Sequence, residues 1–228
     1  MSPEKEFFTH SPFPGTAGIR HNKILNSVFI SFCTILLVLI IWLVWIKKNP
    51  GPDQFVFDAI EPIITPALTQ IMLIITFFGK HVFLIPANLL LILYFLLKKE
   101  NKAALQVLFI SLSSLSVMSL TKRLLQRHRP SDPLVDGVTN YSFPSGHAFM
   151  CVAFFGLLIW YISQKKKIKF IEKAWIASLT VFILVIGFSR IYLRLHYTTD
   201  VIGGFCLGTL WLSFCLWWTA DKSNPENI

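Results

Sequence analysis

Three short strings in the second half of this 228-residue chain combine cations, imidazoles and a carboxylate at the ends of apolar segments. The strings are Lys122-x6-Arg129-Pro130, Pro144-Ser145-Gly146-His147 and Ser189-Arg190-x5-His196-x3-Asp200. Guanidinium groups grip phosphate oxygens in pairs, and an imidazole can attack phosphorus or carry a proton. The residue types therefore predict a site that binds a phosphate and breaks its ester bond.

The spacing of His196 and Asp200 assigns the reacting groups. The two residues are four positions apart, about one helical turn, so the carboxylate can accept the N–H of one ring nitrogen. The other nitrogen is then left bare to attack phosphorus. His147 is the second imidazole of the set, and we expect it to protonate the leaving group.

The remaining polar residues predict a cradle for the phosphate. Lys122, Arg129 and Arg190 supply positive charge, which stabilises the charge that develops as the ester breaks. Ser145 is expected to cap the helix that follows it. Gly146 is expected to let the backbone N–H groups of that helix end approach the phosphate closely.

Hydropathy shows that these residues belong to a membrane protein. The chain is 54% hydrophobic, and its apolar residues fall into blocks long enough to cross a hydrocarbon core of ~30 Å. We predict an all-α, polytopic bundle of six transmembrane helices that forms one membrane domain over residues 24–220. A cytoplasmic N-terminal tail, 1–23, and a C-terminal tail, 221–228, flank it. The predicted spans are 24–46, 81–97, 103–121, 147–163, 174–187 and 201–220.

Two segments between the first and third spans are less regular. Residues 53–66 mix Phe55 and Phe57 with acidic residues and prolines, which predicts a short amphipathic helix at the interface. Residues 68–97 are too long for one span and are broken near Gly79. We expect one span over 81–97, preceded by an interfacial or re-entrant piece, and a two-span hairpin is the alternative.

Alternation of the last four spans brings all three strings to one membrane face. Twelve of the 21 Lys and Arg residues lie on the opposite face with both termini, and nine lie on the face of the strings. Six of these nine are in or beside the strings and are expected to bind substrate. Only three cations, Lys47, Lys48 and Lys80, then remain that would favour a cytoplasmic position for this face. The positive-inside rule then predicts a site on the extracytoplasmic face. The net charge of +9 reflects this arrangement and indicates no nucleic-acid partner.

The sequence predicts no metal and no cofactor. Asp132, Asp136 and Asp200 do not form the paired carboxylates that a divalent ion needs, and the nearby cations would repel it. The four cysteines lie inside apolar stretches without metal-ligand spacing. The expected partners are the lipid bilayer and a membrane lipid phosphate, and no obligatory protein partner is evident.

In order and spacing the strings resemble the signature of the type 2 phosphatidic acid phosphatase family, and no signature position departs from it. The resemblance covers roughly residues 55–216 and implies a metal-independent lipid phosphatase that forms a phosphohistidine. It implies substrates such as phosphatidylglycerol phosphate, undecaprenyl pyrophosphate, phosphatidic acid or diacylglycerol pyrophosphate, at a bacterial plasma membrane. It assigns His196 as nucleophile, Asp200 as its supporting carboxylate, His147 as acid, and Lys122, Arg129, Ser145, Gly146 and Arg190 as phosphate-binding residues.

A transporter or receptor for a lipid phosphate is the alternative function. Such a protein needs the cations but no oriented nucleophile, so the pairing of His196 with Asp200 favours an enzyme. The residue pattern leaves open the preferred lipid, the oligomeric state and the roles of four basic residues, Arg123, Arg127, His128 and Arg194.

Overall fold

The computed structural model describes residues 23–48, 50–135, 139–164 and 168–220, so the two predicted tails fall almost wholly outside the described residues. Within these ranges the chain is helical and contains six segments that are long and apolar enough to cross a membrane. The prediction of an all-α membrane bundle is thereby confirmed. The six segments are Ser27–Ile46, Pro66–Leu97, Asn101–Leu125, Gly146–Ser163, Phe170–Tyr192 and Thr198–Thr219.

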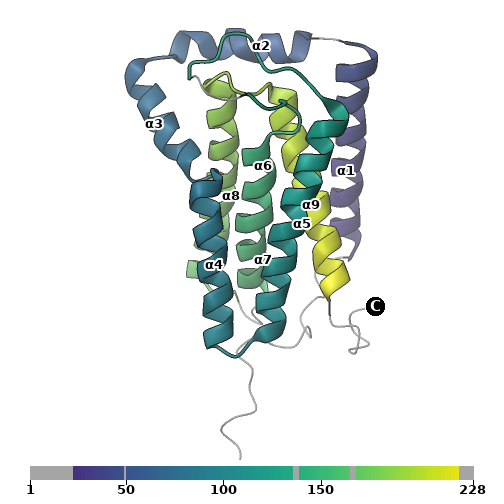
Figure 1. Cartoon of the computed structure of the whole chain (residues 1–228), viewed down its shortest axis with the longest axis vertical. Coiled ribbons are helices and arrows are strands. Elements are labelled where there is room, and N and C mark those ends of the chain that lie inside the picture. Colours follow the sequence, from purple (N-terminus) through teal and green to yellow (C-terminus); the bar gives the residue numbers. More distant parts are fainter. Residues whose placement is uncertain (1–22, 49, 136–138, 165–167, 221–228) are drawn as a thin grey trace, which may run out of the picture.

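A short helix lies across one end of the bundle. Helix α1 (Lys23–Ile41) continues through a π-helical turn, and helix α2 (Gly51–Ile60) then runs roughly across the ends of the spanning helices (Figure 1). Asp53, Phe57 and Ile60 of α2 are buried, whereas Phe55 is 73% exposed. This one-sided burial matches the predicted amphipathic interfacial helix.

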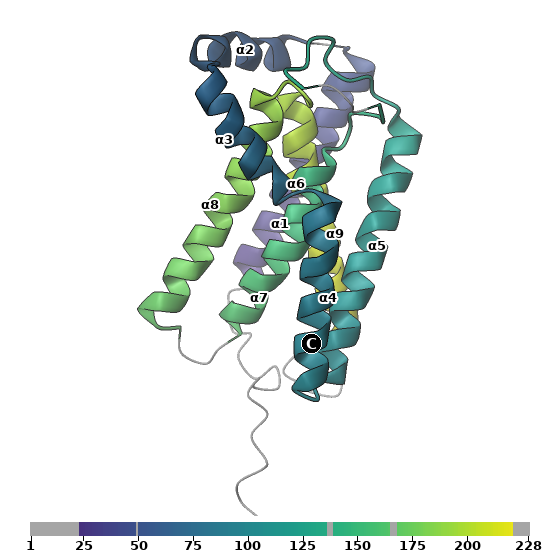
Figure 2. The same ribbon diagram turned by 60° about the vertical axis from the view of Figure 1, so that its left-hand side comes forward.

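The second span is a bent segment and not a hairpin. Helix α3 (Pro66–Phe77) begins beside α2, with Thr65 capping it by accepting from the N–H of Leu68. After a short turn, helix α4 (His81–Leu97) continues toward the far end of the bundle (Figure 2). The piece before residue 81, expected to be interfacial or re-entrant, is therefore the oblique upper half of the span, and its helix α3 packs against α8 (Phe170–Tyr192).

The fourth span is the central helix of the bundle. Helix α6 and its continuation α7 run between α4, α5, α8 and α9, with the π-helical turn Val152–Gly156 joining them (Figures 1 and 2). Their outer neighbours present apolar side chains outward, as a lipid-facing surface requires. The bounds of these helices are α5 Asn101–Leu125, α6 Gly146–Cys151, α7 Leu157–Ser163, α8 Phe170–Tyr192 and α9 Thr198–Thr219.

Two glycines of α9 bring α6 and α9 into close contact. A β-carbon at Gly204 would lie 2.8 Å from the carbonyl oxygen of Ser145, and one at Gly208 would lie 3.0 Å from that of Phe149. Because backbone atoms cannot move aside, only glycine fits at both positions. This contact fixes the start of α6 against the first turns of α9, at the end of the bundle that α2 covers.

Candidate active site

The three predicted strings meet at the end of the bundle beneath α2, as the alternation of spans requires. Each functional side chain is presented by a helix end or by the loop next to one. The positions are Lys122 in the last turn of α5, Arg129 in the following loop, Ser145 to His147 at the start of α6, Arg190 in the last turn of α8, His196 in the α8–α9 loop and Asp200 in the first turn of α9.

His196 is buried, and both of its ring nitrogens have polar neighbours. Its Nδ1 lies 3.5 Å from Oδ2 of Asp200, and its Nε2 lies 3.2 Å from the guanidinium Nη1 of Arg129. Because a guanidinium can only donate, Nε2 must be the accepting nitrogen, and the ring proton sits on Nδ1. The carboxylate of Asp200 orients the imidazole as predicted, and the unprotonated Nε2 faces the cations.

Burial, opposed by the hydrogen bond to Asp200 and reinforced by the charge of Arg129, lowers the pKa of His196 to about 3. An exposed imidazole has a pKa of about 6.5. His196 is therefore neutral at physiological pH.

The Asp200 carboxylate is buried and saturated with hydrogen bonds. Oδ2 accepts from the Ser142 hydroxyl and from the backbone N–H of Tyr197 at 3.0 Å. Oδ1 accepts from the guanidinium of Arg127 at 2.5 Å. The Ser142 hydroxyl also lies 3.4 Å from Nδ1 of His196, so Ser142 helps to fix the positions of both side chains.

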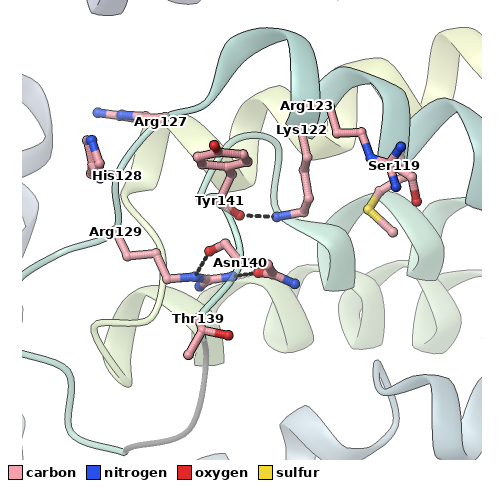
Figure 3. A pocket seen from close by; sticks show the side chains of 10 residues that line it. Ser119, Lys122, Arg123, Arg127, His128, Arg129, Thr139, Asn140 and Tyr141 are labelled. Carbon is pink, nitrogen blue, oxygen red and sulfur yellow. Dashed lines mark hydrogen bonds between the residues drawn. The ribbon is translucent and has the colours of Figure 1, made fainter.

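The three predicted cations are held mainly by neutral acceptors. The ammonium of Lys122 donates to the carbonyl of Tyr141, and Arg129 donates to the carbonyl of Leu195. Arg129 also binds Asn140 through its carbonyl at 2.7 Å and its side-chain oxygen at 2.6 Å (Figure 3). Because carbonyls orient these groups without neutralising them, the cluster keeps its positive charge.

Arg190 is positioned by the bent second span. Its guanidinium donates to the hydroxyl of Thr76 in α3 at 2.7 Å. On the same segment, a β-carbon at Gly79 would lie 2.7 Å from Cδ2 of His147. The bend between α3 and α4 therefore contacts both Arg190 and His147.

Three buried polar atoms of the strings have no hydrogen-bond partner in the described part of the chain. They are Oγ of Ser145, Nε2 of His147 and Nε of Arg190. Ser145 precedes α6 as predicted, but its side chain makes no capping bond, which corrects the expected role. At Gly146, a β-carbon would meet nothing closer than 3.7 Å, so packing against the protein does not explain this glycine.

The basic residues of unassigned role divide into two kinds. Arg194 is paired with Asp132 at 2.8 Å, and Arg127 is paired with Asp200 and with Asp53 at 2.7 Å. Arg123 and His128 instead line a cavity of about 660 Å³ next to the cluster (Figure 3). Lys122, Arg127 and Arg129 also line it, together with the uncharged polar residues Ser119, Thr139, Asn140 and Tyr141.

Sequence reasoning missed Asp53, Thr76, Asn140 and Ser142. Only Asp53 left a recognisable signal, because it precedes Phe57 and Ile60 at helical spacing on the buried face of α2. A carboxylate on such a face needs a partner. No group of three or more His, Cys, Asp or Glu residues suited to a metal ion occurs among the described residues.

Comparison with known proteins finds two similar phosphatases. Phosphatidylglycerophosphatase B of Bacillus subtilis (strain 168) is 28% identical over 165 residues, 69% of this chain and 78% of that protein. An undecaprenyl-diphosphatase of Sulfolobus acidocaldarius is 26% identical over 191 residues, 79% of this chain and 86% of that protein.

A crystal structure of a transmembrane PAP2-type phosphatidylglycerolphosphate phosphatase from Bacillus subtilis superposes with a TM-score of 0.72 at 24% identity. The match covers 85% of this chain and 94% of that one. It confirms an integral membrane fold. The family model described as PAP2 superfamily matches residues 103–224, which contain all three strings. The chain therefore belongs to the PAP2 superfamily.

Proposed function

We propose that this PAP2 phosphatase hydrolyses the phosphomonoester or pyrophosphate of a membrane lipid, without a metal ion, through a phosphohistidine on His196. The observation that carries the proposal is the neutral Nε2 of His196, oriented by Asp200 and facing a cluster of uncompensated cations. A transporter or receptor would need the cations but not this orientation.

In the first step, Nε2 of His196 attacks phosphorus and the bond from phosphorus to the lipid oxygen breaks. Nε2 becomes positively charged as the bond forms, and Asp200, hydrogen-bonded to the Nδ1–H, stabilises that charge. The leaving oxygen takes a proton from the imidazolium form of His147, which becomes neutral. The buried Nε2 of His147 has no other partner in the described chain. Water then attacks the phosphohistidine, and the bond between phosphorus and Nε2 of His196 breaks. His147 takes a proton from the water, and inorganic phosphate leaves.

Lys122, Arg129, Arg190, Ser145 and the backbone at Gly146 are proposed to hold the phosphate oxygens. The unpaired atoms of Arg190 and Ser145 are donors of the kind that a phosphate would satisfy. Charge-assisted hydrogen bonds of this type stabilise the transition state because they are already in place before the reaction.

The cavity next to the cluster is proposed to receive the rest of the headgroup. Its lining includes Lys122, Arg123, Arg127, His128 and Arg129, and none of its described lining residues is acidic. Arg123 and His128 make no ion pair within the described chain, so the cavity is well suited to a second phosphate. We therefore expect a preference for phosphatidylglycerol phosphate, undecaprenyl pyrophosphate or diacylglycerol pyrophosphate over phosphatidic acid.

The active site is proposed to face the extracytoplasmic side of the plasma membrane. The support is the positive-inside rule, since Lys98, Lys99, Lys102, Lys169 and Lys173 lie at the opposite end of the bundle from the strings. The lipid tails would remain beside the spans while the headgroup reaches the site at the level of the interface.

Purified protein should release phosphate from a lipid phosphate in excess EDTA, and His196→Ala should abolish that release. Acid-labile phosphate should be trapped on the parent protein after rapid mixing, and mass spectrometry should place it on His196. Circular dichroism provides the control for folding of the variant. Phosphate trapped on His147, or activity that requires added Mg²⁺, would contradict the mechanism.

The His196 imidazole should stay neutral at pH values well below about 6.5, the pKa of an exposed histidine. ¹⁵N-histidine NMR in nanodiscs should show no titration of its ring between pH 8 and 5, because its folded pKa is about 3. The unfolded imidazole gains a proton below pH ~6.5, so this residue's contribution to stability is lost as the pH falls from there toward 3. A midpoint near 6.5 in the folded protein would contradict the assignment.

Arg123→Gln should reduce kcat/KM for diacylglycerol pyrophosphate by about tenfold, as loss of one charge-assisted hydrogen bond implies. With phosphatidic acid of the same acyl chains, the value should stay within about twofold of the parent. Lys98→Gln, at the far end of the bundle, is the control. An equal loss on both lipids would refute a subsite for the second phosphate.

Sidedness can be read by cysteine labelling on intact cells. Ser131 lies in the exposed loop beside the site, and Lys98 lies at the opposite end. An impermeant maleimide should label Ser131→Cys on intact cells and Lys98→Cys only after lysis. The reverse pattern would place the site in the cytoplasm.

A further inference from the structure

Helix α2 contributes a buried carboxylate to the end of the bundle where the three strings meet. Asp53 is 2% exposed, although it belongs to a helix at the membrane surface. Its Oδ1 accepts from the backbone N–H of Thr199 at 2.9 Å, and its oxygens also bind the Thr199 hydroxyl. Thr199 directly precedes Asp200, so Asp53 holds the first turn of α9 from outside that helix.

Arg127 bridges the two carboxylates. One guanidinium nitrogen lies 2.7 Å from Oδ2 of Asp53, and another lies 2.5 Å from Oδ1 of Asp200. The guanidinium also donates to the Thr199 hydroxyl at 2.7 Å and stacks 4.1 Å from the ring centre of Tyr197. A chain of charged contacts therefore runs from α2 through Arg127 to the carboxylate that orients His196.

We propose that Asp53 is a positioning residue of the reaction, acting through Arg127 on Asp200, so that surface helix α2 is part of the catalytic apparatus. The inference rests on the proposed phosphohistidine mechanism. Asp53 lies outside residues 103–224, the part that matches the family model. It touches none of the five groups proposed to hold the reacting phosphate.

The electrostatic reason is the division of one positive charge between two carboxylates. With Asp53 present, Arg127 is balanced from both sides, and Asp200 remains available to the Nδ1–H of His196. Without the charge of Asp53, Arg127 would interact with Asp200 alone and oppose its stabilisation of the positive imidazole. The first turn of α9 would also lose a charged acceptor for its N–H groups.

Asp53→Asn is the sharpest variant, because it removes the charge and keeps the size and one accepting oxygen. We expect kcat to fall about tenfold for phosphatidic acid and its KM to change less than about twofold, since the five groups proposed to hold the reacting phosphate are untouched. Rapid-mixing experiments should show slower formation of the phosphohistidine by the same factor.

A double-mutant cycle separates positioning from a merely structural role. In an Asp200→Asn background, Asp53→Asn should change kcat by less than about twofold, because the group it acts through is already altered. If Asp53 served only to stabilise the fold, the same loss would appear in both backgrounds. That result, or an unchanged kcat for the single variant, would overturn the proposal.

Asp58→Asn is the matched control on the same helix. Asp58 is exposed and hydrogen-bonds only to Gln54 among the described residues, at 2.7 Å, so kcat should equal that of the parent. If Asp53→Asn does not fold, Asp53→Glu is run through the same cycle with the same two readings. A parent protein that forms no phosphohistidine would instead refute the proposed function, independently of Asp53.

Discussion

The organisation of this end of the bundle depends on keeping several buried cations close together. Lys122 is 8% exposed and Arg190 is 3% exposed, and both lie within electrostatic reach of Arg129. Like charges at low dielectric repel strongly, so each needs an acceptor that does not cancel its charge. Backbone carbonyls and hydroxyls meet this requirement for these three residues, and two carboxylates balance the fourth cation, Arg127.

This constraint explains features that a simple bundle of spans would not need. The loop between α5 and α6 runs back over the site, where Tyr141 and Asn140 present carbonyls to the cations. The second span bends so that Thr76 reaches Arg190. Helix α2 lies across the end of the bundle and delivers Asp53. The loop, the bent span and helix α2 each orient a charged side chain. Together they leave an excess of positive charge that can bind an anion.

Much of this arrangement follows from the sequence alone. Apolar blocks predict six spans, and their alternation places the three strings on one face without knowledge of any contact. The i, i+4 spacing of His196 and Asp200 predicts their pairing. These features are local or follow from topology, so hydropathy and helical geometry are sufficient to find them.

The supporting contacts could not be predicted in the same way. Asp53 and Thr199 are 146 positions apart, and Thr76 and Arg190 are 114 apart. No periodic pattern specifies which buried polar groups meet across such distances. The bend at Gly79 was also ambiguous, because a break in an apolar run fits a hairpin, a re-entrant piece or a kink equally well. Packing of Gly79 against His147 and Ile186 decides between them.

The central claim is that Nε2 of His196 attacks phosphorus inside this cluster. Orthovanadate adopts the trigonal bipyramidal geometry of that transition state, so a crystal structure of the vanadate complex tests the claim directly. We expect vanadium bonded to Nε2 of His196, with its equatorial oxygens contacted by Arg129 and Arg190. Vanadate bonded to His147, or bound in the cavity without contact to His196, would contradict it.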